Sequence, residues 1–298
     1  MPSPLLAGFT DRILGGDARS ILTTFPANSI DCIVTSPPYW QQRDYGVSGQ
    51  LGHEAMFTDY VDNLCGVFDE IKRVLKPTGT AWVNLGDTYT TKQRRNGMPT
   101  KCLLQLPSRF ALEMTARGWT LRNEIIWHKP NCMPESAKDR FTTDFEKLYF
   151  FTKSPRYYFR QQLEAFRSKD GLKRRLPRSS GKKKQRYGET RSSVISPKAA
   201  ATSHRRILKL GRNKRCVWMI PTRPFAGNHF ATFPPALIET PIKAGCPKGG
   251  IVLDPFMGSG TTALVAWSLG RHFIGIDLNP AYVQMASERL AEAAQIAA

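Results

Sequence analysis

The chain alternates short apolar runs with stretches in which apolar residues recur every three or four positions. Residues 30–35 are typical of a buried strand, whereas residues 57–75 have helical spacing and stop at Pro77. The same criteria predict strands at residues 80–85, 121–127, 147–152, 251–253 and 273–276, and helices at residues 107–117, 234–244, 261–269 and 280–294. Strands that alternate with helices of this length predict an α/β fold with a doubly wound, mostly parallel sheet.

Composition limits the classes of protein that remain. The 298 residues are 41% hydrophobic, which excludes a disordered polycation, and the length fits one large α/β domain with an insertion or two modest domains. The formal net charge of +19 indicates a polyanionic partner, and nucleic acid is the first candidate.

Most of the excess charge lies in residues 160–215, which contain nineteen basic and three acidic residues. We expect this segment to contact nucleic-acid phosphates and to order on binding; a solvated basic linker or a localisation signal is the alternative. The candidate DNA-binding residues are Lys173, Arg174, Arg175, Lys182, Lys183, Lys184, Arg186, Arg205 and Arg206.

The sequence carries no signature of export, a membrane span or a metal site. Residues 1–14 do not read as a signal peptide, and no apolar run approaches the ~18 to 20 residues of a membrane span. The six cysteines form no C-x-x-C pair, which favours reduced cysteines and argues against zinc. We therefore expect a cytoplasmic, DNA-associated protein without a metal.

A candidate cofactor site lies near the C-terminus. The predicted strand 251–253 leads into a turn with Gly258 and Gly260, and Thr261 can cap the helix that follows. Asp277 follows the next predicted strand, where an acid accepts hydrogen bonds from ribose hydroxyls. This combination predicts binding of a nucleoside cofactor.

The details of the turn narrow the choice of cofactor. The glycine spacing is not G-x-G-x-x-G, and no Lys-Ser/Thr pair follows as in a P-loop. A cofactor with an adenosine end and no pyrophosphate fits better, so we expect S-adenosyl-L-methionine.

A candidate catalytic turn, Ser36-Pro37-Pro38-Tyr39, follows the first predicted strand. The carboxyl ends of strands are where open α/β sheets place their sites. The Ser36 hydroxyl and the Pro37 carbonyl could accept hydrogen bonds from an exocyclic amine, Pro38 would fix the turn, and Tyr39 could present an exposed face to a base swung out of the duplex. The alternative is a rigid turn with a core aromatic residue.

Both segments resemble known motifs. Ser36-Pro37-Pro38-Tyr39 is similar to the catalytic motif of amino-group DNA methyltransferases, and residues 254–262 resemble their S-adenosylmethionine motif. The order, with the catalytic motif first, is similar to the β class, a circular permutation of the methyltransferase fold. Residues 74–80, 126–131 and 228–234 also agree with the family.

The resemblance implies further site residues and a division of the chain. It implies cofactor contacts from Asp17, Asn228, His229, Phe233, Asp254 and Phe256, although Asp17 could equally be a turn or helix cap. It implies a catalytic half at residues 1–159, a target-recognition region at 160–215 and a cofactor half at 216–298.

A serine in the first motif position usually accompanies cytosine-N4 methylation in this family, so the resemblance implies a site-specific cytosine-N4 DNA methyltransferase acting on double-stranded DNA. Adenine-N6 methylation is the first alternative. An RNA or protein amine methyltransferase and a non-catalytic DNA-binding protein also remain open, as does a partner restriction endonuclease. Methylation at carbon 5 of cytosine is disfavoured because the chain has no Pro-Cys dipeptide.

Overall fold

The computed structural model describes residues 6, 8–91, 97–165, 211–222 and 233–297. The chain divides into two compact units, one formed by residues 1–160 with 216–298 and the other by residues 161–215. In the second unit, strands β6 (Leu163–Glu164) and β7 (Arg212–Asn213) pair antiparallel, and the Glu164 carboxylate accepts from both Arg212 and Arg215.

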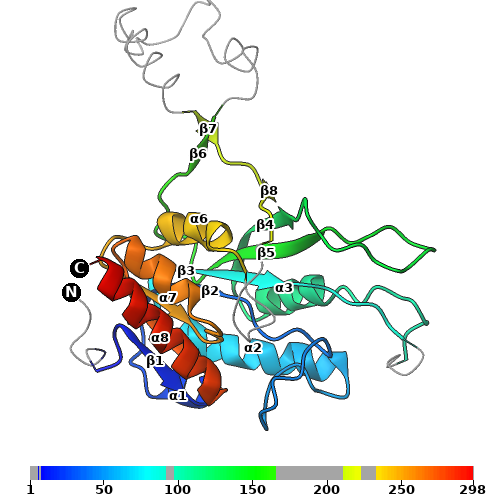
Figure 1. Cartoon of the computed structure of the whole chain (residues 1–298), viewed down its shortest axis with the longest axis horizontal. Helices are drawn as coiled ribbons and strands as arrows, with labels where there is room; N and C mark the ends of the chain where they lie inside the picture. The colour runs from blue at the N-terminus through cyan, green and yellow to red at the C-terminus, as the bar shows by residue number, and fades with distance from the viewer. Residues whose placement is uncertain (1–5, 7, 92–96, 166–210, 223–232, 298) are drawn as a thin grey trace, which may run out of the picture. The chain divides into compact units, whose positions relative to one another are not determined.

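The first unit is built on an eight-stranded sheet in the order β1-β10-β9-β2-β3-β5-β4-β8 (Figure 1). Its strands are β1 (Arg12–Gly15), β2 (Ile30–Thr35), β3 (Leu75–Leu85), β4 (Thr120–His128), β5 (Phe145–Thr152), β8 (Val217–Met219), β9 (Ile251–Asp254) and β10 (His272–Asp277). Neighbouring strands are parallel except at β5, which is antiparallel to both β3 and β4. The expected doubly wound, mostly parallel sheet is therefore confirmed.

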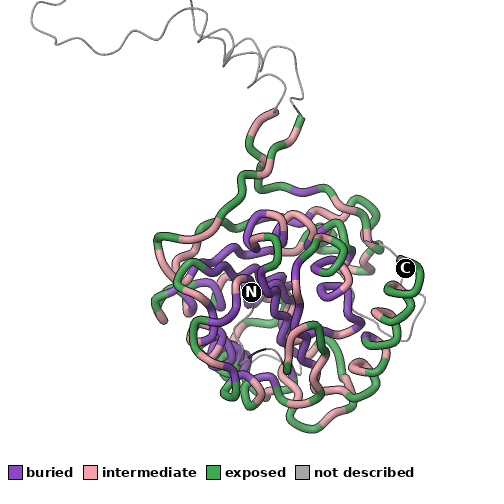
Figure 2. The backbone as a smooth tube through the Cα atoms, turned by 90° about the vertical axis from the view of Figure 1, so that its left-hand side faces the viewer, coloured by how far each residue is buried: buried purple, intermediate pink, exposed green. Residues whose placement is uncertain are grey.

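Helices cover both faces of this sheet (Figure 1). One face carries α1 (Ala18–Thr23), α2 (Phe57–Val74) and α3 (Leu106–Ala116), and the other carries α6 (Pro235–Gly245), α7 (Thr261–Ser268) and α8 (Pro280–Ala297). The central strands are buried on both sides, because each face packs into its own apolar cluster. Figure 2 shows the buried residues (purple) mostly inside, with exposed residues (green) around them. None of the described helices is long and apolar enough to cross a membrane.

The sequence-based elements lie close to the observed ones, with two differences. β3 begins at Leu75, directly after α2, and runs through Pro77 and Gly79 rather than starting at Thr80. The short elements β1, α1, β6, β7 and β8 were not expected, because two to six residues give too weak a pattern.

Candidate active site

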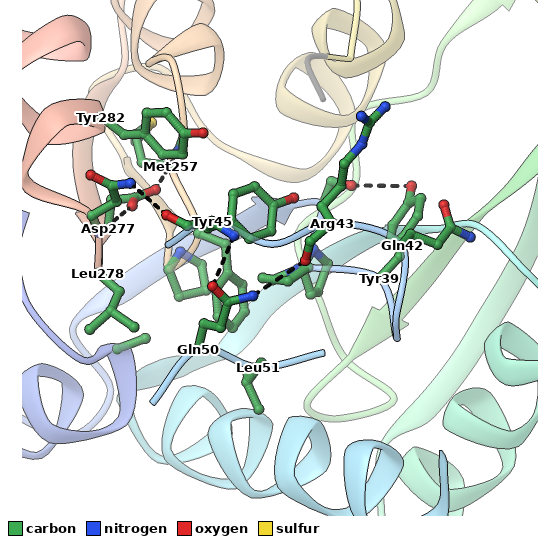
Figure 3. Close-up of a pocket in the computed structure, with 18 of the residues that line it drawn as sticks. Tyr39, Gln42, Arg43, Tyr45, Gln50, Leu51, Met257, Asp277, Leu278 and Tyr282 are labelled. Carbon is green, nitrogen blue, oxygen red and sulfur yellow. Dashed lines mark hydrogen bonds between the residues drawn. The ribbon is translucent and has the colours of Figure 1, made fainter. Parts of the chain in front are cut away.

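The first unit contains a cavity of about 1060 Å³ at the carboxyl ends of the parallel strands. Residues at or just after the ends of β1, β2, β9 and β10 contribute to its wall, including Asp17, Ser36, Phe256 and Asp277. In the close-up of Figure 3, Asp277 lies toward the left of the labelled residues and Tyr39 toward the right. The two motifs, more than 200 residues apart, thus share one cavity large enough for a nucleoside cofactor and part of a second molecule.

The glycine turn after β9 is held against Asp277. The Gly258 N–H donates to Asp277 Oδ2 and the Asn279 N–H donates to Oδ1, each at 2.8 Å. A carboxylate oxygen can accept more than one hydrogen bond, so both oxygens can still accept from ribose hydroxyls. Burial raises the pKa of Asp277, and the two backbone donors oppose that rise.

Gly260 has a supporting position in this turn. Its φ is +84°, and a Cβ there would lie 2.9 Å from the Ala286 side chain of α8. Gly260 is not part of the cavity wall, so glycine is needed here for close packing of the turn onto α8.

Asp254 lies beneath the cavity wall rather than on it. Its side chain is fully buried, accepts from the Thr35 and Thr262 hydroxyls at 2.6 Å each, and also accepts from the Phe256 N–H at 3.1 Å. Burial raises the pKa of Asp254 to about 6 against the effect of these donors. Asp254 is therefore a buried residue that supports two turns, the one that follows Thr35 and the one that precedes Thr262.

Asp17 is a helix cap that also lies on the cavity wall, so its contact with a cofactor stays a prediction. It caps α1 by accepting from the Ser20 N–H at 2.8 Å and the Ser20 hydroxyl at 2.7 Å, and it also lines the cavity. Phe233, Phe256, Gly258 and Thr261 line the cavity as well. Asn228, His229 and all nine candidate DNA-binding residues lie outside the described residues.

The catalytic turn is fixed by contacts on both sides. The Tyr60 hydroxyl donates to the Pro38 carbonyl at 2.8 Å, and Trp40 is 2% exposed. Tyr39 is half-buried rather than fully presented, because its ring packs on Gly86 and its hydroxyl faces inward. Ser36, Pro37, Pro38 and Tyr39 all line the cavity.

Three polar residues at this end of the cavity were missed from the sequence. Glu146 of β5 accepts from the Tyr39 hydroxyl at 2.7 Å and from the Asn84 amide at 3.0 Å, and it forms an ion pair with Lys129. Since β5 is antiparallel, its amino end lies at the edge where the other strands end. A charged residue at the start of β5 would have been a usable signal had the reversed direction of that strand been known.

The loop between β2 and α2 also contacts the start of α8. The Asn279 amide donates to the Tyr45 carbonyl at 3.1 Å, and the Tyr45 and Tyr282 rings meet edge to face at 6.1 Å (Figure 3). Aromatic rings near a carboxylate suit an adenosine group. Tyr45, Asn279 and Tyr282 were not expected, because neither their spacing nor their residue type is distinctive.

The chemistry of the donor set therefore fits S-adenosyl-L-methionine. Asp277 offers carboxylate acceptors, Phe256 and Tyr45 offer apolar surfaces, and the Gly258 turn opens the helix that starts at Thr261. Among the described residues no group of three or more His, Cys, Asp or Glu side chains is placed to hold a metal ion.

Comparison with known proteins agrees with this site. A family model described as DNA methylase, of the N6/N4 methyltransferase type, matches residues 30–288. The type II methyltransferase M.XycI of Xanthomonas campestris pv. cyanopsidis is 39% identical over 97% of this chain and 90% of its own length. M.Cfr9I of Citrobacter freundii is 40% identical over 92% of this chain and 86% of its own length.

Solved structures share the fold. A protein from Thermus thermophilus, provisionally assigned as a DNA modification methylase and solved with S-adenosyl-L-methionine, has a TM-score of 0.62 at 28% identity, covering 94% of this chain and 93% of its own. The PvuII cytosine-N4-specific DNA methyltransferase has a TM-score of 0.65 at 20% identity, covering 93% of this chain and 85% of its own. From its two turns, its cavity and these matches, the chain belongs to the S-adenosyl-L-methionine-dependent DNA methylase family that methylates amino groups at cytosine N4 or adenine N6.

Proposed function

We propose that this DNA methyltransferase acts on the exocyclic N4 amine of a cytosine swung out of double-stranded DNA. The observation that carries the proposal is the position of Ser36 on the wall of the cavity that the cofactor turn also lines. The Ser36 hydrogen is directed to the Tyr39 hydroxyl at 3.3 Å, so the lone pairs of Ser36 Oγ remain available to an amine N–H. A serine in place of an acidic residue at this position supports cytosine over adenine.

The residues of the turn would prepare the amine for attack. The amine is a weak nucleophile because its lone pair is conjugated into the ring, and acceptors on its N–H bonds favour the rehybridised nitrogen. Ser36 Oγ and the Pro37 carbonyl would accept these bonds, Pro38 is held in place by Tyr60, and the Tyr39 ring would contact the base. The cofactor supplies a methyl group on a positively charged sulfur.

The cofactor end would be bound by residues that line the cavity. Asp277 would accept from the ribose hydroxyls, and Phe256 and Phe233 would cover the apolar parts of the cofactor. Asp17 would contribute from the end of β1. Asp254 and Gly260 would act by supporting the turn, whereas the roles of Asn228 and His229 stay predictions.

DNA would be held by the basic residues of the 160–215 segment, and this assignment rests on charge alone. The relatives named type II methyltransferases favour a role in restriction and modification. A partner endonuclease stays a prediction.

Nucleoside mass spectrometry of DNA methylated by the protein tests the proposal directly. Digested product DNA should contain N4-methylcytosine, and N6-methyladenine in its place would establish the adenine alternative. Parallel incubations with RNA and with protein should remain unmodified. A protein that binds DNA and transfers no methyl group to any of the three would be the non-catalytic alternative.

A further inference from the structure

Three hydrogen-bonding groups at the end of the cavity form a directed chain. Ser36 Oγ donates to Tyr39 Oη at 3.3 Å, and Tyr39 Oη donates to Glu146 Oε2 at 2.7 Å. Each hydroxyl therefore passes its hydrogen away from the place where the base amine would lie. The chain begins at the proposed amine acceptor and ends at a carboxylate.

Glu146 is held in position by neighbours that come from the turn after β2, from β3 and from the segment after β4. Its side chain is 15% exposed; the Asn84 amide of β3 donates to Oε2 at 3.0 Å, and the Lys129 ammonium just beyond β4 forms an ion pair with Oε1. The Lys129 ammonium also lies 4.5 Å above the Trp127 ring. These contacts fix the direction of the carboxylate and pair it with a cation.

Methylation of an amine leaves one proton to be removed. When the N–C bond forms and the C–S bond breaks, the sulfur takes the electron pair and the nitrogen carries a positive charge. The nitrogen becomes neutral when an N–H bond breaks and its electron pair returns to nitrogen. A base bound in this cavity would limit direct transfer of that proton to water.

We propose that this proton leaves through Ser36 and Tyr39 to Glu146, which acts through Tyr39 as the terminal proton acceptor. Ser36 Oγ takes the amine proton as its own hydrogen passes to Tyr39 Oη, and the tyrosine hydrogen passes to Glu146 Oε2. In sum, the amine loses one proton and the Glu146 carboxylate gains one, while Ser36 and Tyr39 each end as neutral hydroxyls. Glu146 lines the cavity, so it can release the proton to water after the product leaves. The inference rests on the proposed amine methylation and holds for either base.

The surroundings of Tyr39 favour passing a proton on to Glu146 over leaving Tyr39 ionised. Burial, followed by the negative charge of Glu146, raises the pKa of Tyr39 well above its ordinary value. Tyr39 therefore stays a neutral phenol that both accepts and donates a hydrogen bond. The titratable groups that face it are Glu146 and Tyr60, and Lys129 is the cation that faces Glu146.

The pH dependence of single-turnover methyl transfer tests the proton path. The wild-type rate should fall at acid pH, giving the profile an acid limb, because a protonated Glu146 carboxyl accepts no further proton. Glu146→Gln and Tyr39→Phe should each lose this acid limb and react about 100-fold more slowly, and the double variant should be no slower than either single one. Glu146→Asp should recover part of the rate and keep the limb.

Glu124→Gln is the matched control. Glu124 on β4 also pairs with a lysine, Lys147 on β5, at 2.8 Å, yet it does not line the cavity. It should retain the wild-type rate and profile. Thermal melting and S-adenosyl-L-methionine binding by calorimetry check that each variant is folded; if Glu146→Gln is not, Tyr39→Phe decides.

Carbon-13 NMR titration of the Glu146 carboxyl, assigned through its loss in Glu146→Gln, gives a readout without turnover. The pH range over which this signal changes should coincide with the acid limb of the rate profile. An unchanged profile in Glu146→Gln or Tyr39→Phe, or additive losses in the double variant, would overturn the relay. Absence of amine methylation by wild type on any substrate would instead refute the proposed function.

Discussion

Thr35 donates its hydroxyl hydrogen to the Asp254 carboxylate at 2.6 Å. Thr35 is the last residue before the catalytic turn, and Asp254 is the last residue of the strand that leads into the cofactor turn. Thr262, at the start of α7, donates to the other Asp254 oxygen at 2.6 Å. One buried carboxylate therefore ties both turns to a common support.

We expect Asp254→Asn to remove a pH dependence of stability. Burial raises the pKa of Asp254 to about 6 in the folded chain, above the value of roughly 3.9 in an unfolded chain. A carboxyl group with a raised folded pKa contributes stability that is fully present below the unfolded pKa and is lost as pH rises through the folded pKa. The free energy of unfolding of wild type relative to the variant should fall between about pH 4 and pH 6, by up to about 1.4 kcal/mol per pH unit.

Denaturant unfolding of both proteins across this pH range measures the effect. Thr35→Val is the complementary variant, because removing a donor that lowers the pKa of Asp254 should extend the window to higher pH. A constant difference between wild type and Asp254→Asn from pH 4 to pH 7 would show that Asp254 ionises normally.

Ser36→Ala should lower methyl transfer by about 100-fold or more, because one of the two acceptors aimed at the amine is removed. The affinity for S-adenosyl-L-methionine should stay at the wild-type value, since Ser36 belongs to the base end of the cavity. Single-turnover assays with labelled cofactor, together with calorimetry, separate the two effects. Wild-type turnover in this variant would remove Ser36 from the catalytic assignment.

The sequence pattern was sufficient to predict the parallel strands of the core and the two turns that follow β2 and β9. Residues 30–35 and 251–253 are short apolar runs, and these strands are buried on both faces. A strand buried on both faces needs apolar residues along its length, so such a run indicates a central strand. The turns that follow were recognisable because glycine, proline and serine have specific conformational and chemical roles at strand ends. Their meeting in one cavity follows from the parallel direction of β2 and β9.

The part of the site formed by Glu146, Lys129 and Asn84 depends on long-range pairing. Whether Glu146 faces the cavity is decided by the antiparallel register of β5 between β3 and β4, in which Asn84 pairs with Leu148. Local periodicity is the same for a strand of either direction, so the sequence alone could not place Glu146. The edge-to-face contact of Tyr45 with Tyr282 likewise joins a loop to a helix 237 residues later in the chain.

Asp277→Ala should mainly weaken the binding of S-adenosyl-L-methionine, with a smaller effect on the rate of methyl transfer. Hydrogen bonds to a charged group contribute about 1.5 to 3 kcal/mol each, so the loss should be about tenfold or greater. Asp277→Asn keeps the shape of the side chain and one acceptor, and should lose less. Calorimetric affinities of the two variants give the comparison, and a wild-type affinity in Asp277→Ala would count against the ribose role.

Gly86→Ala should impair methyl transfer while cofactor affinity is retained. A Cβ at residue 86 would lie 2.6 Å from Tyr39 Cε2, and the ring cannot simply turn away because its hydroxyl is bonded to Glu146. Displacement of a positioned group by about 1 Å can cost about 100-fold in rate. Gly8→Ala is the control, because a Cβ there would meet no atom within 4 Å. Equal rates for the two variants would show that the position of Tyr39 is not limiting.

Replacing Lys182, Lys183 and Lys184 with glutamine should weaken binding to every DNA sequence. Each lysine that contacts a phosphate releases counterions, so each lost contact should reduce the slope of log affinity against log salt by roughly 0.9. Lys248→Gln is the control, since Lys248 is an exposed residue that precedes β9 at the opposite edge of the sheet from the cavity. Binding titrations of a fixed duplex at several salt concentrations give both slopes. A wild-type slope in the triple variant would mean that these lysines form a solvated tail, and the charge that holds the DNA would then have to lie elsewhere in the chain.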